Sequence, residues 1–176
     1  FRRKNVERIM LEWEKELPAG YNESITKQLL EGVCFNADSY EFDLLGALYQ
    51  VIMNEGNKSS KGSYFTPAFI IDDIISRYYR ENDKVLDPCC GSGQFLLRFA
   101  KHSKCSYENL FGIDIDKICV RIAAINLLLW YNETDFAPHI YHLNTLQDID
   151  PNSVFDEYSF LYDTFNIVAT NPPWGS

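Results

Sequence analysis

Apolar side chains near the start of the chain recur every three or four residues, the spacing of one face of a helix. This face comprises Val6, Ile9, Met10, Trp13 and Leu17. The stretch Pro18–Gly20 ends the helix, and a second short helix is expected over Ser24–Val33. Asp38 and Glu41 have the spacing of a capping box that opens a third helix. The apolar face of this third helix comprises Phe42, Leu45, Leu48, Tyr49 and Ile52.

After the polar loop Asn54–Gly62, apolar runs of strand length alternate with helical patterns. A helix is expected from Thr66, as N-cap, through Pro67 in the first turn to about Tyr79. Further helices are expected over 94–101 and 116–131, with strands over 84–87, 109–113, 139–143 and 165–170. This alternation predicts an α/β fold, a parallel sheet with helices on both faces. We therefore divide the chain into a helical region, 1–62, and a core, 63–176.

The composition is that of an ordinary globular chain: 46% of the residues are hydrophobic and 23% are charged, which suffices for a real core. The longest apolar stretch, Ile122–Tyr131, is interrupted by Asn126 and is shorter than a membrane span. We interpret it as a buried helix and expect no membrane association. The start, Phe1–Lys4, lacks a signal-peptide pattern, and a first residue other than Met indicates a fragment.

The cysteines indicate a cytoplasmic protein without a metal site. The chain has five, an odd number, at positions 34, 89, 90, 105 and 119, and neither they nor the three histidines show zinc-ligand spacing. We interpret them as reduced thiols in a cytoplasmic protein. The net charge of −9 argues against a protein that coats DNA, because neutralising phosphates requires Lys and Arg. It does not exclude an enzyme that grips DNA through another region.

A glycine-containing turn follows the first strand of the core, in the sequence Asp87 to Phe95. Gly91 and Gly93 allow positive φ and a close approach of a ligand to the backbone, with Cys89 as a small neighbour. A dinucleotide-binding turn would have a small residue at position 96, where this chain has Leu96, and no carboxylate facing the phosphates of the ligand. A carboxylate at Asp87 would instead stabilise the ammonium group of S-adenosylmethionine (SAM). The turn therefore favours SAM over a dinucleotide.

Two more strand ends carry candidate cofactor-binding residues. Asp114 ends the second strand about 20 residues after the turn, where a carboxylate can accept hydrogen bonds from ribose hydroxyls. Ile115 could pack on the adenine face, and we assign helix capping to Asp116. Asn144 ends the third strand, and either an adenine contact or a turn role fits it equally well.

The tetrapeptide Asn171-Pro172-Pro173-Trp174 after the fourth strand is the most informative segment. The two prolines fix the backbone and leave nearby carbonyls free to accept hydrogen bonds. The side chain of Asn171 supplies another acceptor, and Trp174 supplies a flat surface for stacking. Two acceptors beside an aromatic plate suit an amino group on a planar ring. We therefore take this segment as the catalytic site.

These motifs together resemble those of SAM-dependent adenine amino-methyltransferases of restriction-modification systems, both type I modification subunits and type II or IIG enzymes. The matching pieces, which run from about Asp43 to the end, are Leu45–Tyr49, Gly62–Pro67, Asp87–Phe95, Gly112–Asp114 and Asn171–Trp174. The resemblance implies a Rossmann-like class I methyltransferase fold. It also implies methyl transfer from SAM to the exocyclic amino group of an adenine flipped out of DNA.

The resemblance further implies individual roles. Thr66 would approach the methionine end of SAM, Asn171 and the Pro172 carbonyl would accept the amino hydrogens, and Trp174 would stack on the base. Asn144 stands where the family often has Asp. Family members work with DNA and with specificity or restriction subunits.

The chain stops at Ser176, before the further strands and the target-recognition domain of such enzymes. We therefore expect the isolated chain to be inactive, with the DNA-gripping regions elsewhere. Two alternatives stay open at this point. The site could methylate RNA bases or protein glutamine, because Asn-Pro-Pro-aromatic segments occur in such enzymes too. The chain could also be a non-catalytic module that binds SAM or a partner.

Overall fold

The structure is a computed structural model that describes residues 4–17, 43, 45–47, 49, 66–132, 134–146 and 165–172. The expected helix at 24–33, the capping box at Asp38 and the loop at 54–62 lie outside these residues. The described elements, in chain order, are α1 (Lys4–Glu14), α4 (Ala68–Tyr78), β1 (Val85–Asp87), α5 (Gln94–Ser103), the 3-10 helix Tyr107–Asn109, β2 (Leu110–Asp114), α6 (Lys117–Trp130), β3 (His139–His142) and β4 (Ile167–Val168).

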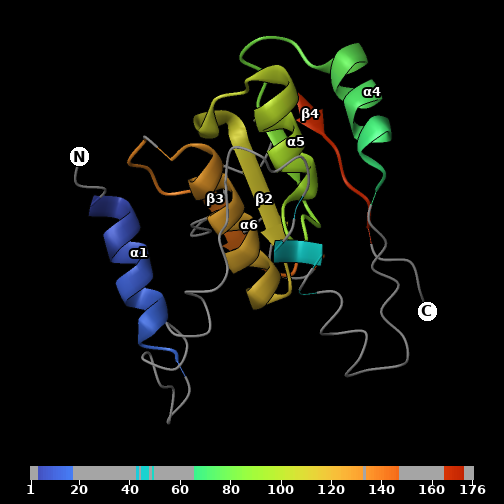
Figure 1. Ribbon diagram of the computed structural model, residues 1–176. Coiled ribbons are helices and arrows are strands. Elements are labelled where there is room, and N and C mark those ends of the chain that lie inside the picture. Colours follow the sequence, from blue (N-terminus) through green and yellow to red (C-terminus); the bar gives the residue numbers. More distant parts are fainter. Residues whose placement is uncertain are drawn as a thin grey trace, which may run out of the picture.

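The four strands form one parallel sheet in the order β3-β2-β1-β4 (Figure 1). Val85 of β1 pairs with Leu110 on one side and Ile167 on the other. The chain moves outward from β1 through β2 to β3 and then returns to β4 on the opposite side of β1. Ligands of open parallel sheets bind where the strand order reverses in this way, outside the carboxyl ends of the strands. The topology thus brings the turn after β1 next to the segment after β4.

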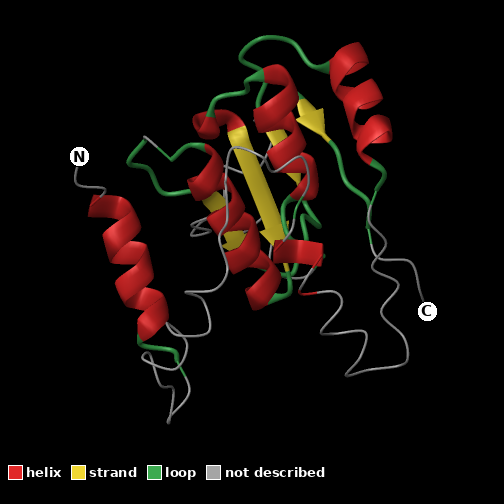
Figure 2. Cartoon of the chain, viewed as in Figure 1, coloured by secondary structure: helices red, strands yellow, loops and turns green. Residues whose placement is uncertain are grey.

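Helices α5 and α6 cover one face of the sheet, because the two crossovers β1-α5-β2 and β2-α6-β3 are right-handed (Figure 2). The main core lies here and includes the fully buried Leu96, Phe99 and Leu127. A second cluster is formed by Phe111 and Ile113, which point to the other face because side chains alternate along a strand. Among the described residues no helix packs on that second face. The expected parallel α/β sheet is confirmed, whereas helices on the second face, also expected, are not found among the described residues.

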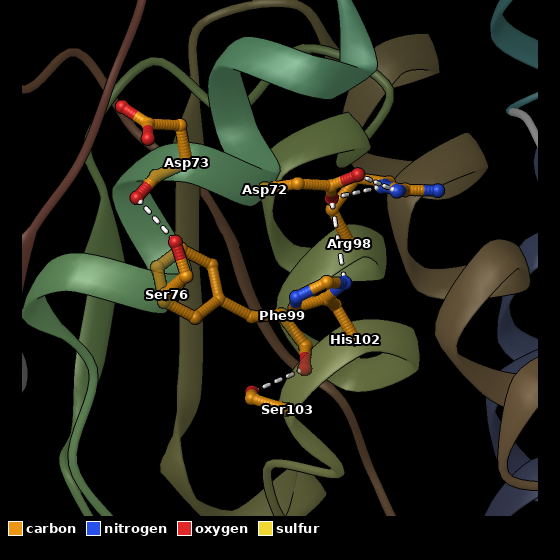
Figure 3. Close-up of polar contacts among 7 residues, drawn as sticks. All are labelled: Asp72, Asp73, Ser76, Arg98, Phe99, His102 and Ser103. Atoms are coloured by element: carbon orange, nitrogen blue, oxygen red, sulfur yellow. Dashed lines mark hydrogen bonds and ion pairs between the residues drawn. The ribbon is translucent and has the colours of Figure 1, made fainter.

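Helix α4 packs on α5 through an apolar and a charged contact (Figure 3). The Asp72 carboxylate of α4 accepts a hydrogen bond from Arg98 Nε at 2.9 Å and a second one from the same guanidinium group. His102 Nδ1 lies 3.8 Å from Asp72 Oδ1. The expected N-cap was wrong by one residue: the cap is Pro67, whose extended ψ of 134° precedes the helix, and Thr66 provides no side-chain cap. The Thr66 carbonyl instead accepts a hydrogen bond from the Gln94 side chain at 2.9 Å.

The expected helix at the start of the chain is present as α1, although none of its residues is buried. Glu16, just after α1, pairs with both Lys117 and Arg121 of α6. The Arg121 guanidinium also lies 5.6 Å from the centre of the Trp13 ring. Polar and cation–π contacts therefore attach α1 to α6. None of the described helices combines the length and the apolar character needed to cross a membrane.

Candidate functional site

The glycine turn after β1 has the backbone that its sequence predicts. Gly91 and Gly93 have φ values of +53° and +84°, in the left-handed region that favours glycine. The Gly93 N–H donates to the Cys90 carbonyl at 2.8 Å, and the Cys90 N–H donates to the Ile113 carbonyl of β2 at 2.8 Å. A Cβ added at Gly91 would meet no atom within 4 Å. The turn is thus held in place and borders open space, which fits close approach of a ligand.

Asp114, at the end of β2, lies directly against this turn. One carboxylate oxygen accepts the Gly91 N–H at 2.7 Å, and the other accepts the Asp116 N–H at 2.8 Å. Asp116 in turn caps α6, because its Oδ1 accepts from Ile118 N–H at 2.8 Å and from Cys119 N–H at 3.4 Å. The assignment of capping to Asp116 is confirmed. Carboxylate oxygens have further lone pairs, so Asp114 retains acceptor capacity for ribose hydroxyls.

Asp87 is nearly inaccessible, with 2% of its surface exposed. Burial raises the pKa of its carboxyl group to about 7, although the Thr170 hydroxyl and the Cys89 N–H lower it. The Cys89 N–H lies 3.1 Å from Asp87 Oδ1. At neutral pH this group is therefore only partly ionised, and its repulsion of a phosphate is weaker than the sequence alone indicated. A cationic ligand beside it would favour the ionised form.

The segments after β2 and β3 are tied to each other and to the turn. The side chain of Ile115 is 67% exposed, while its carbonyl lies 3.0 Å from His142 Nε2. The Thr145 hydroxyl donates to the Pro88 carbonyl at 2.7 Å, which joins the loop after β3 to the turn after β1. Asn144 Oδ1 accepts the Leu146 N–H at 3.1 Å, so Asn144 does have the turn role that was one of its two interpretations.

The described part of the segment Asn171–Trp174, the predicted catalytic site, follows β4, which is shorter than the expected strand over 165–170. The Ala169 N–H donates to the Leu86 carbonyl at 3.0 Å, which places the chain leading to Asn171 alongside the end of β1. Pro172 is exposed. Pro173 and Trp174 lie outside the described residues, so their roles stay predictions.

The cysteines at the turn have free thiol groups. Cys89, Cys90, Cys105 and Cys119 are free thiols, and burial raises the pKa of Cys89 and Cys90. The described residues contain no cluster of three or more His, Cys, Asp or Glu side chains arranged to hold a metal ion.

Three residues that no sequence motif assigned to the site contact the turn or the neighbouring cap of α6. Asn126 of α6 and Asp43 share a hydrogen bond at 2.7 Å, and Tyr49 donates its hydroxyl proton to Asp116 at 2.8 Å. Asn126 did carry a signal, because it is a polar residue within the apolar run that forms α6. A polar side chain at such a position is buried only with a partner.

Comparison with known families gives a match over most of the chain: the sequence model of the family described as N-6 DNA Methylase matches residues 40–176. The match includes the turn, Asp114 and the segment after β4, and it begins close to Asp43.

Individual relatives agree with this match. The chain is 24% identical over 135 residues to the type II methyltransferase M.VspI of Vibrio sp. (strain 343), covering 74% of this chain and 30% of that protein. It is 25% identical over 152 residues to the EcoEI methylase subunit of a type I restriction enzyme of Escherichia coli, covering 79% and 29%. The chain thus spans about 30% of the length of these curated relatives.

A solved structure shows the same fold. The type IIL restriction-modification enzyme MmeI, determined in complex with DNA, superposes with a TM-score of 0.58 at 20% identity, covering 77% of this chain and 27% of that one.

Proposed function

The chain belongs to the N-6 DNA methylase family, and on this premise we propose that it forms the cofactor-binding and catalytic core of a SAM-dependent DNA adenine methyltransferase of a restriction-modification system. A methyltransferase requires a methyl donor. The observation that carries the choice of SAM is the Asp114 carboxylate, which lies 2.7 Å from Gly91 N–H beside a turn open to ligand. A ribose-binding carboxylate next to a partly ionised Asp87 suits a cofactor that has a ribose and an ammonium group.

The residues present fit this cofactor in the following way. Asp114 would accept the ribose hydroxyls, Ile115 would cover the adenine ring, and Asp87 would face the ammonium group together with Thr66. When bound, SAM supplies an electrophilic methyl carbon attached to a sulfonium. Asn144 is proposed as a further neighbour of the cofactor adenine through its side chain, besides its turn role.

At the neighbouring strand end, Asn171 and the Pro172 carbonyl would accept the two hydrogens of the adenine amino group. These bonds hold the nitrogen lone pair toward the methyl group, and Trp174 would stack on the flipped base. The amino nitrogen would gain the methyl group as its carbon–sulfur bond breaks, and one amino proton would then leave to solvent. No strong base is required, since the proton is acidic once the methyl group is attached, and positioning supplies most of the rate.

We propose that DNA is bound with the help of basic regions other than this chain, whose net charge is −9. Specificity or restriction subunits are the proposed protein partners, since relatives include type I methylase subunits.

The experiment that tests this function uses the chain purified together with the DNA-binding regions proposed above, and supplies it with radiolabelled SAM and with double-stranded DNA, RNA or a glutamine-containing protein. Label is expected in DNA, and the matched Asn171→Ala variant should incorporate none above background. Label that enters only RNA or protein would reassign the substrate. SAM binding without transfer to any of the three would indicate a non-catalytic module.

A further inference from the structure

Residues that precede the core in the sequence are connected to the glycine turn by hydrogen bonds through Asn126 of α6. Asp43 is 4% exposed, and its Oδ1 accepts two hydrogen bonds, from Gly46 N–H at 2.8 Å and from the Asn126 side-chain amide at 2.7 Å. The same Asn126 nitrogen donates to the Ser92 carbonyl at 2.9 Å. Asp43 and the Ser92 carbonyl are therefore connected through the amide group of Asn126, which is 83 residues from Asp43 in the sequence.

Ser92 is the middle residue of the turn, between the two glycines with positive φ. Its backbone carbonyl is the atom that Asn126 holds, and both Ser92 and Asn126 are buried. On the opposite side, the Gly91 N–H is held by Asp114. The turn is thus fixed at two of its peptide groups, by Asp114 at the Gly91 N–H and by the Asp43–Asn126 pair at the Ser92 carbonyl.

A second connection from the same segment reaches Asp114. The Tyr49 hydroxyl donates to Asp116 Oδ2 at 2.8 Å, and Asp116 N–H donates to Asp114 Oδ1 at 2.8 Å. Burial raises the pKa of Tyr49, so its hydroxyl stays a donor at neutral pH. Figure 1 shows the described helical residues of this segment, in cyan, beside the carboxyl end of β2.

Close packing at Gly46 makes this arrangement specific. A Cβ added there would lie 2.1 Å from Asp43 Oδ2 and 2.2 Å from Ser92 Oγ. Glycine at this position therefore allows the segment to approach the turn this closely, because a larger residue would have to displace the buried side chains of Asp43 and Ser92.

We propose that Asp43 and Asn126 are positioning residues for cofactor binding, which hold the glycine turn in its binding geometry through the Ser92 carbonyl. The inference rests on the proposed function, because it names residues that act on the same cofactor site. Asp43 acts as an acceptor that orients the Asn126 amide, and Asn126 acts as the donor to the turn. Neither is proposed to touch the cofactor.

Three variants separate positioning from general stability. Asn126→Ala removes the donor to Ser92. Asp43→Asn keeps an acceptor oxygen for both donors and serves as the conservative rescue. The double variant Asp43→Ala/Asn126→Leu replaces both polar partners by apolar groups, which is often nearly neutral for stability. The leucine side chain introduced at position 126 has the branched shape of asparagine. The alanine introduced at position 43 leaves room for the two methyl groups of that leucine. Ser76→Ala, on the exposed side of α4, is the control.

The affinity for SAM is measured by calorimetry, next to the melting temperature without SAM. We expect about tenfold weaker binding for Asn126→Ala and for the double variant, the equivalent of one hydrogen bond, whatever their melting temperatures. Asp43→Asn and the Ser76→Ala control should bind within about threefold of the original protein. A double variant that melts normally and binds SAM normally would overturn the proposal.

Amide hydrogen exchange of the unliganded protein gives a readout that needs no cofactor. Exchange over residues 89–95 should accelerate about tenfold in the double variant, while exchange over β3 stays unchanged. Unchanged exchange over 89–95 would contradict the positioning role even if the protein bound no SAM. Failure of the original protein to bind SAM, with faster exchange in the variant, would instead contradict the proposed function alone.

Discussion

The two halves of the proposed site lie at the ends of neighbouring strands that differ in their place in the described sheet: β1 lies between β2 and β4, and β4 is outermost. At the end of β1, the turn donates a hydrogen bond to Asp114 and accepts hydrogen bonds from Asn126 and Thr145. At the end of β4, a strand of two residues lies at the edge of the sheet, and its Val168 side chain is 62% exposed. The cofactor half is thus fixed before a ligand arrives.

This difference suggests that cofactor binding and methyl transfer can be separated by mutation. Substitutions at the end of β1 should change the affinity for SAM. Substitutions at the end of β4 should change turnover while SAM still binds. The predictions below follow this division, from the largest expected effect to the smallest.

The largest effect is expected for Asn171→Ala. Loss of the acceptor that orients the target amino group should lower kcat by roughly 100-fold or more, the range seen when one preorganised polar group is removed from an active site. The dissociation constant for SAM should stay within about threefold, because Asn171 lies outside the turn. Steady-state methylation measures kcat, and calorimetry on the same preparation measures the dissociation constant for SAM. Near-normal turnover would refute the role of Asn171.

The converse effect is expected for Asp114→Ala. Loss of two charge-assisted hydrogen bonds to ribose hydroxyls should cost on the order of 2–3 kcal/mol, or roughly 30- to 150-fold in SAM affinity. Asp73→Ala is the matched control, since it removes an exposed carboxylate on α4. The variant must be shown to be folded, because Asp114 also binds the Gly91 N–H. Unchanged affinity in a folded Asp114→Ala protein would rule out the assignment.

Asp87 should make SAM binding depend on pH. Its pKa of about 7 means that at pH 6 most of the protein must release a proton before the carboxylate can face an ammonium group. SAM affinity should therefore rise about tenfold from pH 6 to pH 8. Asp87→Asn should flatten this dependence. A wild-type affinity that is constant between these pH values would show that Asp87 does not face the cofactor's charge.

The same group affects stability with the opposite sign. Because the pKa of Asp87 in the folded protein lies above its ordinary value of 3.8, the folded state binds this proton more tightly than the unfolded state. Its contribution to stability is full below about pH 4 and is lost as the pH rises to about 7. Compared with Asp87→Asn in urea unfolding, the original protein should lose stability over this range. An identical pH dependence in both proteins would contradict the raised pKa.

The smallest effect on the site is expected for Asp72→Ala, which breaks the contact of α4 with Arg98 on α5 (Figure 3). The partly buried pair should contribute roughly 1–2 kcal/mol, against a few tenths for the exposed Asp73–Arg77 pair. Thermal unfolding of Asp72→Ala and Asp73→Ala measures the difference. SAM affinity should change less than threefold in both, and a large loss in Asp72→Ala would show that α4 also positions the turn.

Much of the fold followed from the sequence because its determinants are local. Alternating apolar runs located the strands, and Asp116 was identified as a cap from its place before an apolar helix. The start of α4 was misplaced, since Thr-Pro fits a cap at either residue and the Gln94 contact with the Thr66 carbonyl joins positions 28 residues apart. The periodicity of apolar residues and the secondary-structure propensities of single residues contain no information on such distant pairs.

The candidate site was predicted in part for the same reason. Asp114 and the glycines lie at strand ends, whose meeting point follows from parallel topology. The pairing of Asp43 with Asn126 spans 83 residues, and neither residue belongs to a strand-end motif. The partial neutralisation of Asp87 was also missed, because its pKa depends on burial rather than on neighbours in the sequence.

The most direct test of the central claim is to identify the methylated nucleoside. DNA containing all sequence contexts is incubated with SAM bearing a deuterated methyl group and with the chain purified together with its proposed DNA-binding regions, then digested and analysed by mass spectrometry. If the site acts as proposed, the label appears in N6-methyladenine, and Asn171→Ala produces none. Label in methylated cytosine, or label that is absent from DNA and present in RNA or protein, would contradict the assignment of adenine as the substrate.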